Sequence, residues 1–170
     1  MSAAYRVRKP FPTRWNDNDQ YGHLNNTVYY AAMDTAVNAF MIREGGLEPV
    51  GGDAIALCAA SSCEFLAPAG FPEPLEVGIG VERLGTTSVT WALGILRAGQ
   101  DEPIATGRFV HVFVDAEGRR PTPVPTSIRA AIESRLLSTG RWSTDPRSTT
   151  PRLSLSEGAP ATETKRPESR

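Results

Sequence analysis

The sequence predicts an α+β domain in which one long central helix is wrapped by an antiparallel β-sheet. Three observations support this prediction. Only one stretch has strong helical periodicity, a strand-like segment precedes it, and about four strand-like segments separated by turn signals follow it. The length of 170 residues suits one domain with one hydrophobic core.

The first predicted strand covers residues 5–15. Alternate residues from Tyr5 to Phe11 form one face in a rough period of two, and Pro10 indicates an edge strand or a strand end. The next segment, residues 16–23, is too rich in Asn, Asp and Gly for a regular element. It predicts a structured loop.

The predicted helix begins at Asn25 or Asn26, either of which can cap it, and stops at the pair Gly45-Gly46. Its apolar residues recur at helical spacing, and several are alanines, which allow a neighbouring backbone to approach closely: Val28, Tyr29, Ala32, Met33, Ala36, Ala39 and Phe40. We therefore expect a largely buried helix.

Strand-like runs and turn signals alternate after the helix. The runs cover residues 54–66, 75–84, 87–97 and 104–114, and the last three are expected to be consecutive antiparallel hairpin strands. Ser127 is expected to cap a short last helix over residues 128–137.

The composition changes at residue 138. Residues 138–170 are rich in Ser, Thr, Pro, Arg and Glu, and their only large apolar residues are Trp142, Leu153 and Leu155. Such a composition cannot offset the entropy of ordering the chain. We expect one domain over residues 1–137 and a disordered tail without a catalytic role over residues 138–170.

Charge and hydropathy narrow the function classes. A formal net charge of −1 gives no electrostatic basis for binding nucleic acid or an anionic membrane surface. No secretion signal is visible, and no apolar stretch approaches the roughly 18 residues that a membrane span needs. We expect a cytoplasmic protein whose partner is a small ligand or another protein. Cys58 and Cys63 are expected to be reduced core thiols on opposite faces of one strand.

The candidate site is the polar segment directly before the helix. Six polar or turn-forming residues fall within ten positions there: Asp17, Asp19, Gly22, His23, Asn25 and Asn26. A purely structural alternative is that the aspartates form Asx turns, the glycine adopts a positive φ and the asparagines cap the helix. Spacing alone leaves both readings open.

Metal binding fits the same segment poorly. The first positions of a calcium loop match, but Val28 stands where that loop requires a bidentate carboxylate. A zinc site would draw on Asp17, Asp19 and His23, and His111 is the only other histidine. We expect no metal. His111 alternates with aromatic residues on one strand and is expected to be a packed histidine.

The segment places a carboxylate beside the N-terminus of a buried helix, whose free N–H groups attract developing negative charge. This pairing suits acyl transfer. The amides near Asn26 to Val28 would polarise a thioester carbonyl, while a carboxylate attacks the carbonyl or activates a water. No metal or organic cofactor is required.

Residues 14–29, which read RWNDNDQYGHLNNTVY, resemble the signature of the 4-hydroxybenzoyl-CoA thioesterase family of hotdog proteins. The resemblance extends more loosely over about residues 5–137. It implies a hotdog fold, hydrolysis of acyl- or aroyl-CoA, and a homodimer or homotetramer in which sheets pair edge to edge and share two active sites.

The resemblance also implies roles for individual residues. Asp19 matches the catalytic aspartate of the family, whereas Asp17 is expected to hold the loop. The backbone amide of Asn26 matches the group that polarises the carbonyl. His23 and Asn25 match a subgroup in which we expect them to shape the site or position water.

Two pairs of residues are candidate contacts for coenzyme A. Thr87 and Ser88 resemble positions where relatives meet the pantetheine arm, or they are simply strand formers. Arg119 and Arg120 suit the phosphates of CoA, because guanidinium groups bind phosphate well, or they belong to a solvated loop.

The leading hypothesis is therefore a homo-oligomeric thioesterase that hydrolyses acyl-CoA, with Asp19 as nucleophile or general base. One alternative is a thioesterase for acyl groups on a carrier protein. A second alternative is a hotdog module that binds an acyl-CoA or a partner protein without turnover.

Overall fold

The computed structural model describes residues 5–137, and the predicted tail at residues 138–170 lies outside this part of the chain. The elements follow in the order β1 (Val7–Pro12), α1 (Asn26–Arg43), β2 (Ala54–Phe65), β3 (Pro74–Leu84), β4 (Ser88–Arg97), β5 (Pro103–Asp115) and α2 (Thr126–Ile132). A short 3₁₀ turn, Trp15–Asp17, follows β1, and a π-helical turn, Glu133–Leu137, follows α2.

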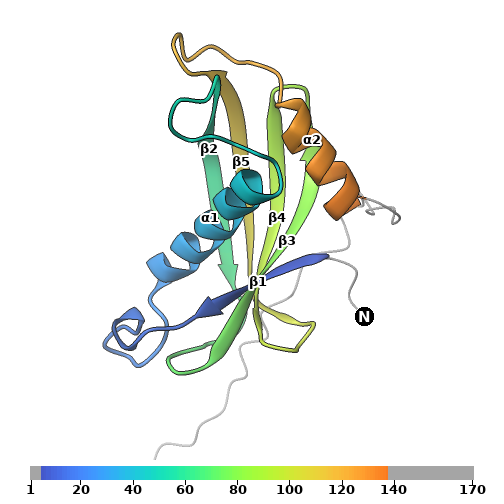
Figure 1. Ribbon diagram of the computed structural model, residues 1–170. Coiled ribbons are helices and arrows are strands. Elements are labelled where there is room, and N and C mark those ends of the chain that lie inside the picture. The colour runs from blue at the N-terminus through green and yellow to red at the C-terminus, as the bar shows by residue number, and fades with distance from the viewer. Residues whose placement is uncertain (1–4, 138–170) are drawn as a thin grey trace, which may run out of the picture.

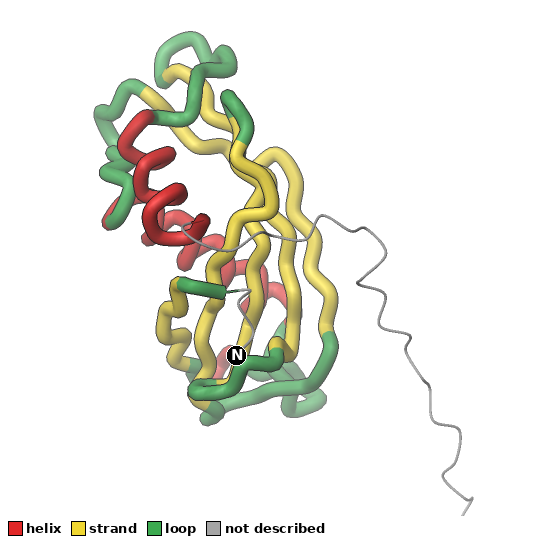
Figure 2. The backbone as a smooth tube through the Cα atoms, turned by 90° about the vertical axis from the view of Figure 1, so that its right-hand side faces the viewer, coloured by secondary structure: helices red, strands yellow, loops and turns green. Residues whose placement is uncertain are grey.

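The five strands form one antiparallel sheet in the order β1-β3-β4-β5-β2. Both helices lie on the same side of this sheet (Figures 1 and 2). The predicted α+β class, with a helix packed on an antiparallel sheet, is confirmed. The first strand is shorter than predicted, because it ends at Pro12 and the chain then enters the 3₁₀ turn.

The core lies between α1 and the middle strands. Met33, Val37 and Phe40 of α1 are fully buried, and the Phe40 ring meets Trp91 of β4 edge to face, with ring centroids 5.9 Å apart. Each fully buried side chain of this size contributes about 1.5–3 kcal/mol to folding. The N-terminus of α1 is thus held on a rigid support.

Both ends of the helical segment that follows the loop agree with the sequence. Asn25 is the residue that caps α1, and Gly46 adopts a left-handed φ of 66° just after the helix. Glycine has no side chain that would clash in this conformation, so the helix ends here without backbone strain. The second helix differs from the prediction, because it begins earlier, at Thr126. Its N-cap is Pro125, which makes no capping hydrogen bond, and Ser127 is not the cap.

The two cysteines correct another expectation. The register of β2 on β5 shifts between Cys58 and Ala60, so that Cys58 lies opposite His111 and Cys63 opposite Gly107. Because a bulge inserts one extra residue, both thiols face the helix side instead of opposite sides. Both are free, but Cys58 is exposed and is not a core residue.

β2 forms one edge of the sheet and is 12 residues long. Its side chains are mostly exposed, including Leu57 and Phe65. A long edge strand with exposed apolar side chains is a ready template for pairing with another chain. Over residues 5–137, no helix has both the length and the apolar character to cross a membrane.

Candidate functional site

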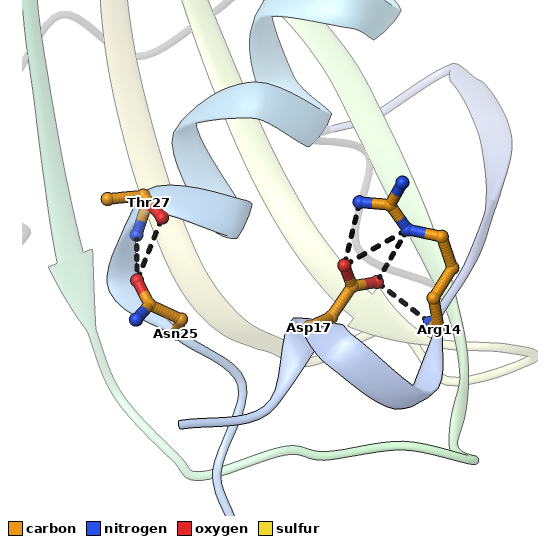
Figure 3. Close-up of polar contacts among 4 residues, drawn as sticks. All are labelled: Arg14, Asp17, Asn25 and Thr27. Atoms are coloured by element: carbon orange, nitrogen blue, oxygen red, sulfur yellow. Dashed lines mark hydrogen bonds and ion pairs between the residues drawn. The ribbon is translucent and has the colours of Figure 1, made fainter. Parts of the chain in front are cut away.

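The loop between β1 and α1 is fastened by the carboxylate of Asp17. This side chain is 2% exposed and accepts hydrogen bonds from the Arg14 backbone N–H at 2.7 Å and from the Arg14 guanidinium at 2.8 and 3.0 Å (Figure 3). Hydrogen bonding from Arg14 lowers the pKa of Asp17 below its usual value, so the carboxylate is ionised at neutral pH.

Backbone contacts extend this anchor to the helix. The Asp17 carbonyl accepts from the Asn25 N–H at 2.8 Å, and Asn18 and Leu24 form an isolated antiparallel bridge. Asp19 and His23 are joined by a backbone hydrogen bond of 2.7 Å. The candidate segment is therefore a folded hairpin-like loop that returns directly to the start of α1.

The Asp19 carboxylate points into the turn that it begins. Its Oδ1 atom accepts from the backbone N–H groups of Tyr21, at 2.8 Å, and His23, at 3.2 Å. Gly22 completes this turn with a φ of 80°, a conformation that L side chains rarely adopt. The predicted Asx turn is thus present, and it fixes the orientation of the carboxylate.

The N-terminus of α1 leaves one amide unused. The Asn25 side chain accepts from the Thr27 N–H at 3.0 Å and the Thr27 hydroxyl at 2.8 Å (Figure 3), and the Asn25 carbonyl accepts from Val28. No described residue accepts a hydrogen bond from the Asn26 N–H. The expected group of amides from Asn26 to Val28 is therefore reduced to Asn26 alone.

Asp19, His23 and Asn26 line one pocket of about 280 Å³. The opposite wall comes mainly from the end of β2 and the turn that follows it, so that the pocket is also lined by Leu24, Tyr29, Phe65, Leu66, Ala67 and Pro68. The pocket is thus lined on one side by the polar residues Asp19, His23 and Asn26 and on the other mainly by apolar residues. Asn25 is not among the lining residues, and its side chain caps the helix instead.

Tyr29, Phe65 and Leu66 were not predicted as site residues. Tyr29 has the spacing of a core residue, and it is indeed only 3% exposed. Phe65 and Leu66 lie almost forty residues from the polar segment, and no motif links the two. Only the position of β2 beside the start of α1 reveals their place in the site.

The predicted CoA contacts lie at the other end of the sheet. Ser88 pairs with Val112 of β5, whereas Phe65 pairs with Ala105, seven residues away along the same strand. At the usual rise of a strand this step is about 23 Å. Within one chain, the structure therefore does not bring Thr87 and Ser88 to the pocket of Asp19.

Arg119 and Arg120 belong to the same distant end. They lie in the turn after β5, where the Arg120 carbonyl accepts from the Asp115 N–H at 2.9 Å. The Phe113 N–H donates to the Thr87 carbonyl at 2.8 Å, which places Thr87 beside this turn. The four predicted contacts thus form one group, separate from the group around Asp19.

His111 is a packed histidine, as predicted. It is 1% exposed, its Nδ1 atom has no hydrogen-bond partner, and its ring lies edge to face with Trp91. Burial lowers the pKa of His111. In residues 5–137, no group of three or more His, Cys, Asp and Glu side chains is arranged to hold a metal.

A second, larger groove of about 690 Å³ runs between α1 and β1. It is lined by the alanine-rich side of the helix and by β1, and it contains none of Asp19, His23 and Asn26. The carboxylate and the free amide therefore single out the smaller pocket as the candidate active site.

Comparisons with known proteins identify relatives. A family model described as the thioesterase-like superfamily matches residues 13–132. The crystal structure of the PA5185 protein from Pseudomonas aeruginosa strain PAO1 shares 47% identity over 78% of this chain and 92% of that chain, with a TM-score of 0.75. No curated protein matches the chain.

Two further solved structures are similar. The PA2801 protein from Pseudomonas aeruginosa, a proposed thioesterase, shares 30% identity over 75% of this chain and 98% of that chain, with a TM-score of 0.69. A thioesterase from Thermus thermophilus, solved in complex with coenzyme A and Zn, shares 28% identity over 79% and 96% of the two chains, with a TM-score of 0.61.

Proposed function

The chain belongs to the thioesterase-like superfamily, and from this premise we propose that it hydrolyses acyl-CoA to a free acid and CoA. The observation that carries the proposal is a single pocket lined both by Asp19 and by Asn26, the first residue of α1, whose backbone N–H has no hydrogen-bond acceptor among residues 5–137. One group supplies attack on a thioester, and the other supplies stabilisation of the oxyanion. Within the superfamily, the motif over residues 14–29 favours the 4-hydroxybenzoyl-CoA thioesterase family.

In the proposed reaction, the thioester carbonyl oxygen accepts a hydrogen bond from the Asn26 N–H. The positive end of α1 adds to this stabilisation, and a preorganised donor of this kind is worth about 10²–10³ in rate. Asp19 either attacks the carbonyl carbon or takes a proton from an attacking water. If Asp19 takes a proton from water, the C–S bond breaks after the water oxygen has added to the carbonyl carbon, and this proton passes to the sulfur, so that CoA leaves as the thiol. If Asp19 attacks directly, CoA leaves as the thiolate, and water then hydrolyses the mixed anhydride on Asp19, which releases the free acid, restores the carboxylate and supplies the proton of the thiol.

Other residues of the loop support these two groups. His23 lines the pocket and is proposed to position the water. Asn25 is proposed to act indirectly, since its cap orients the first turn of α1 and so the Asn26 N–H. Asp17 holds the loop through Arg14, and this ion pair is proposed to be structural.

We propose that a homodimer, or a tetramer built from such dimers, completes the site. If β2 pairs antiparallel with β2 of a second copy, the two-fold axis brings the far end of one sheet beside the near end of the other. Thr87, Ser88, Arg119 and Arg120 of one copy would then meet the CoA that reaches Asp19 of the other. The exposed length of β2 supports this arrangement.

The test is release of free thiol from a panel of short-chain, long-chain and aromatic acyl-CoAs, with the same acyl groups also offered on an acyl carrier protein. Hydrolysis of one or more acyl-CoAs is the expected result. If only the carrier-protein thioesters are hydrolysed, the substrate is an acyl carrier protein and not acyl-CoA. Binding without any thiol release would indicate a non-catalytic module.

A further inference from the structure

One side of the Asp19 pocket is lined by apolar residues that the proposed chemistry does not use, and this side is here called the apolar compartment. Beyond the polar groups, every lining side chain is uncharged, and the walls come from Leu24, Tyr29, Phe65, Leu66, Ala67 and Pro68. The whole pocket, including the space beside the polar residues, has a volume of about 280 Å³, so that only part of this volume is left for the acyl group. The compartment suits the acyl part of a thioester, and its size favours a compact one.

Tyr29 forms the fixed part of this compartment. It follows Asn26 by three residues on α1, so the two lie on the same side of the helix. The side chain is buried, and its helix is anchored by the core residues Met33 and Phe40. A substrate whose carbonyl meets the Asn26 N–H therefore has the Tyr29 ring beside its acyl group.

Phe65 forms the outer, more exposed part of this compartment. It is the last residue of β2, it is 45% exposed, and its ring meets the Tyr29 ring edge to face, with centroids 5.1 Å apart and an interplanar angle of 83°. Its partner on β5 is the small residue Ala105. Because Phe65 is half-exposed, removing its ring would enlarge this side of the pocket at the loss of one ring contact, the contact with Tyr29.

We propose that Phe65, held against Tyr29, determines specificity by limiting the length of the acyl group. The pocket then accepts compact acyl groups and discriminates against long straight chains. This inference rests on the proposed function, because it names the substrate class of the same site.

The test uses dissociation constants, so that it does not depend on turnover. S-butyl-CoA and S-decyl-CoA are thioethers without a carbonyl and cannot be hydrolysed. They are titrated calorimetrically into the full-length wild type, Phe65→Ala, Phe65→Leu and Leu57→Ala. Leu57 is a matched control, because it is a similarly exposed apolar residue on β2 that lies outside the pocket.

Phe65→Ala is expected to improve binding of the decyl compound relative to the butyl compound by at least about tenfold, the scale on which apolar pockets discriminate chain length. Phe65→Leu should give a smaller shift, and Leu57→Ala none. An unchanged ratio in Phe65→Ala, an equal shift in Leu57→Ala, or no binding of either thioether to the wild type would each overturn the inference. The expected shift without thiol release from any acyl-CoA would support the inference and remove the thioesterase proposal.

Discussion

At the scale of single residues, two aspartates separated by one position have different surroundings. Asp17 is buried and bound by Arg14, whereas Asp19 lines the pocket and is held by backbone N–H groups. A carboxylate that is tied to a guanidinium cannot attack a substrate, but one that is held by its own turn remains available. The sequence motif names both residues, and their contacts support the different roles.

Replacing Asp17 should cost stability more than activity. Asp17→Asn removes the charge from a buried group that accepts several hydrogen bonds, so the free energy of unfolding should fall by about 1–3 kcal/mol. Urea denaturation measures the loss, and thiol release should stay near the wild-type level under stabilising conditions. Asp34→Asn, an exposed carboxylate on α1, is the control. Equal stability of the two variants would contradict the structural role of Asp17.

His111 should make stability depend on pH. Because burial lowers its pKa below the usual 6.5, the unfolded chain binds a proton that the folded protein resists. This contribution is complete above the usual value, and stability is lost as the pH falls from about 6.5 through the lowered pKa. Urea denaturation over this range should show the slope in the wild type and in His23→Leu, but not in His111→Leu. A slope that persists in His111→Leu would assign it to other groups.

At the scale of elements, the sequence predicts most of the order but not the register. The polar loop, the helix and four antiparallel strands follow from turn residues and periodicity, since these are local signals. The bulge between Cys58 and Ala60 has no such signal, and it places both thiols on the same face of the sheet instead of on opposite faces. The cap at Asn25 could be placed only to within one residue until the helix geometry was known.

The cap at Asn25 should be worth about 1 kcal/mol to the free energy of unfolding, the usual loss when such a side chain is replaced by alanine. Asn25→Ala should therefore lower stability and also reduce turnover, because the first turn of α1 carries the Asn26 N–H. Asn25→Asp keeps the acceptor and should retain both properties. Asn38→Ala, further along the same helix, is the control for replacing an asparagine away from the cap. An Asn25→Ala variant as stable as Asn38→Ala would show that the cap contributes little.

At the scale of the whole molecule, the candidate residues fall into two groups at opposite ends of the sheet. Position in the sequence does not predict this separation, because successive hairpins bring residues from distant segments to the same end of the sheet. Asp19 and Asn26 share a pocket, whereas Ser88 and Arg119 lie far from it in the same chain. A site that uses both groups therefore has to combine two copies of the chain. This conclusion follows from the strand pairing, which places the two groups at opposite ends of one sheet.

A mixing experiment tests the shared site. Asp19→Asn lacks the proposed catalytic carboxylate, and the double variant Arg119→Ala/Arg120→Ala lacks the proposed phosphate contacts. If each site takes one group from each copy, a mixed dimer contains one complete site. Unfolding and refolding the two variants together should then give more thiol release than the sum of the separate preparations. Activity that never exceeds this sum would place both groups in one chain or remove the arginines from the site.

The most direct test of the central claim is the turnover of Asp19→Asn. The amide oxygen of asparagine can still accept the Tyr21 and His23 N–H bonds, so the loop, the melting temperature and CoA affinity should be preserved. Thiol release from the best acyl-CoA of the panel should fall by about 10²–10⁴, the usual contribution of a positioned acid or base. Turnover comparable to the wild type, in a variant with an unchanged melting temperature, would remove Asp19 from the mechanism.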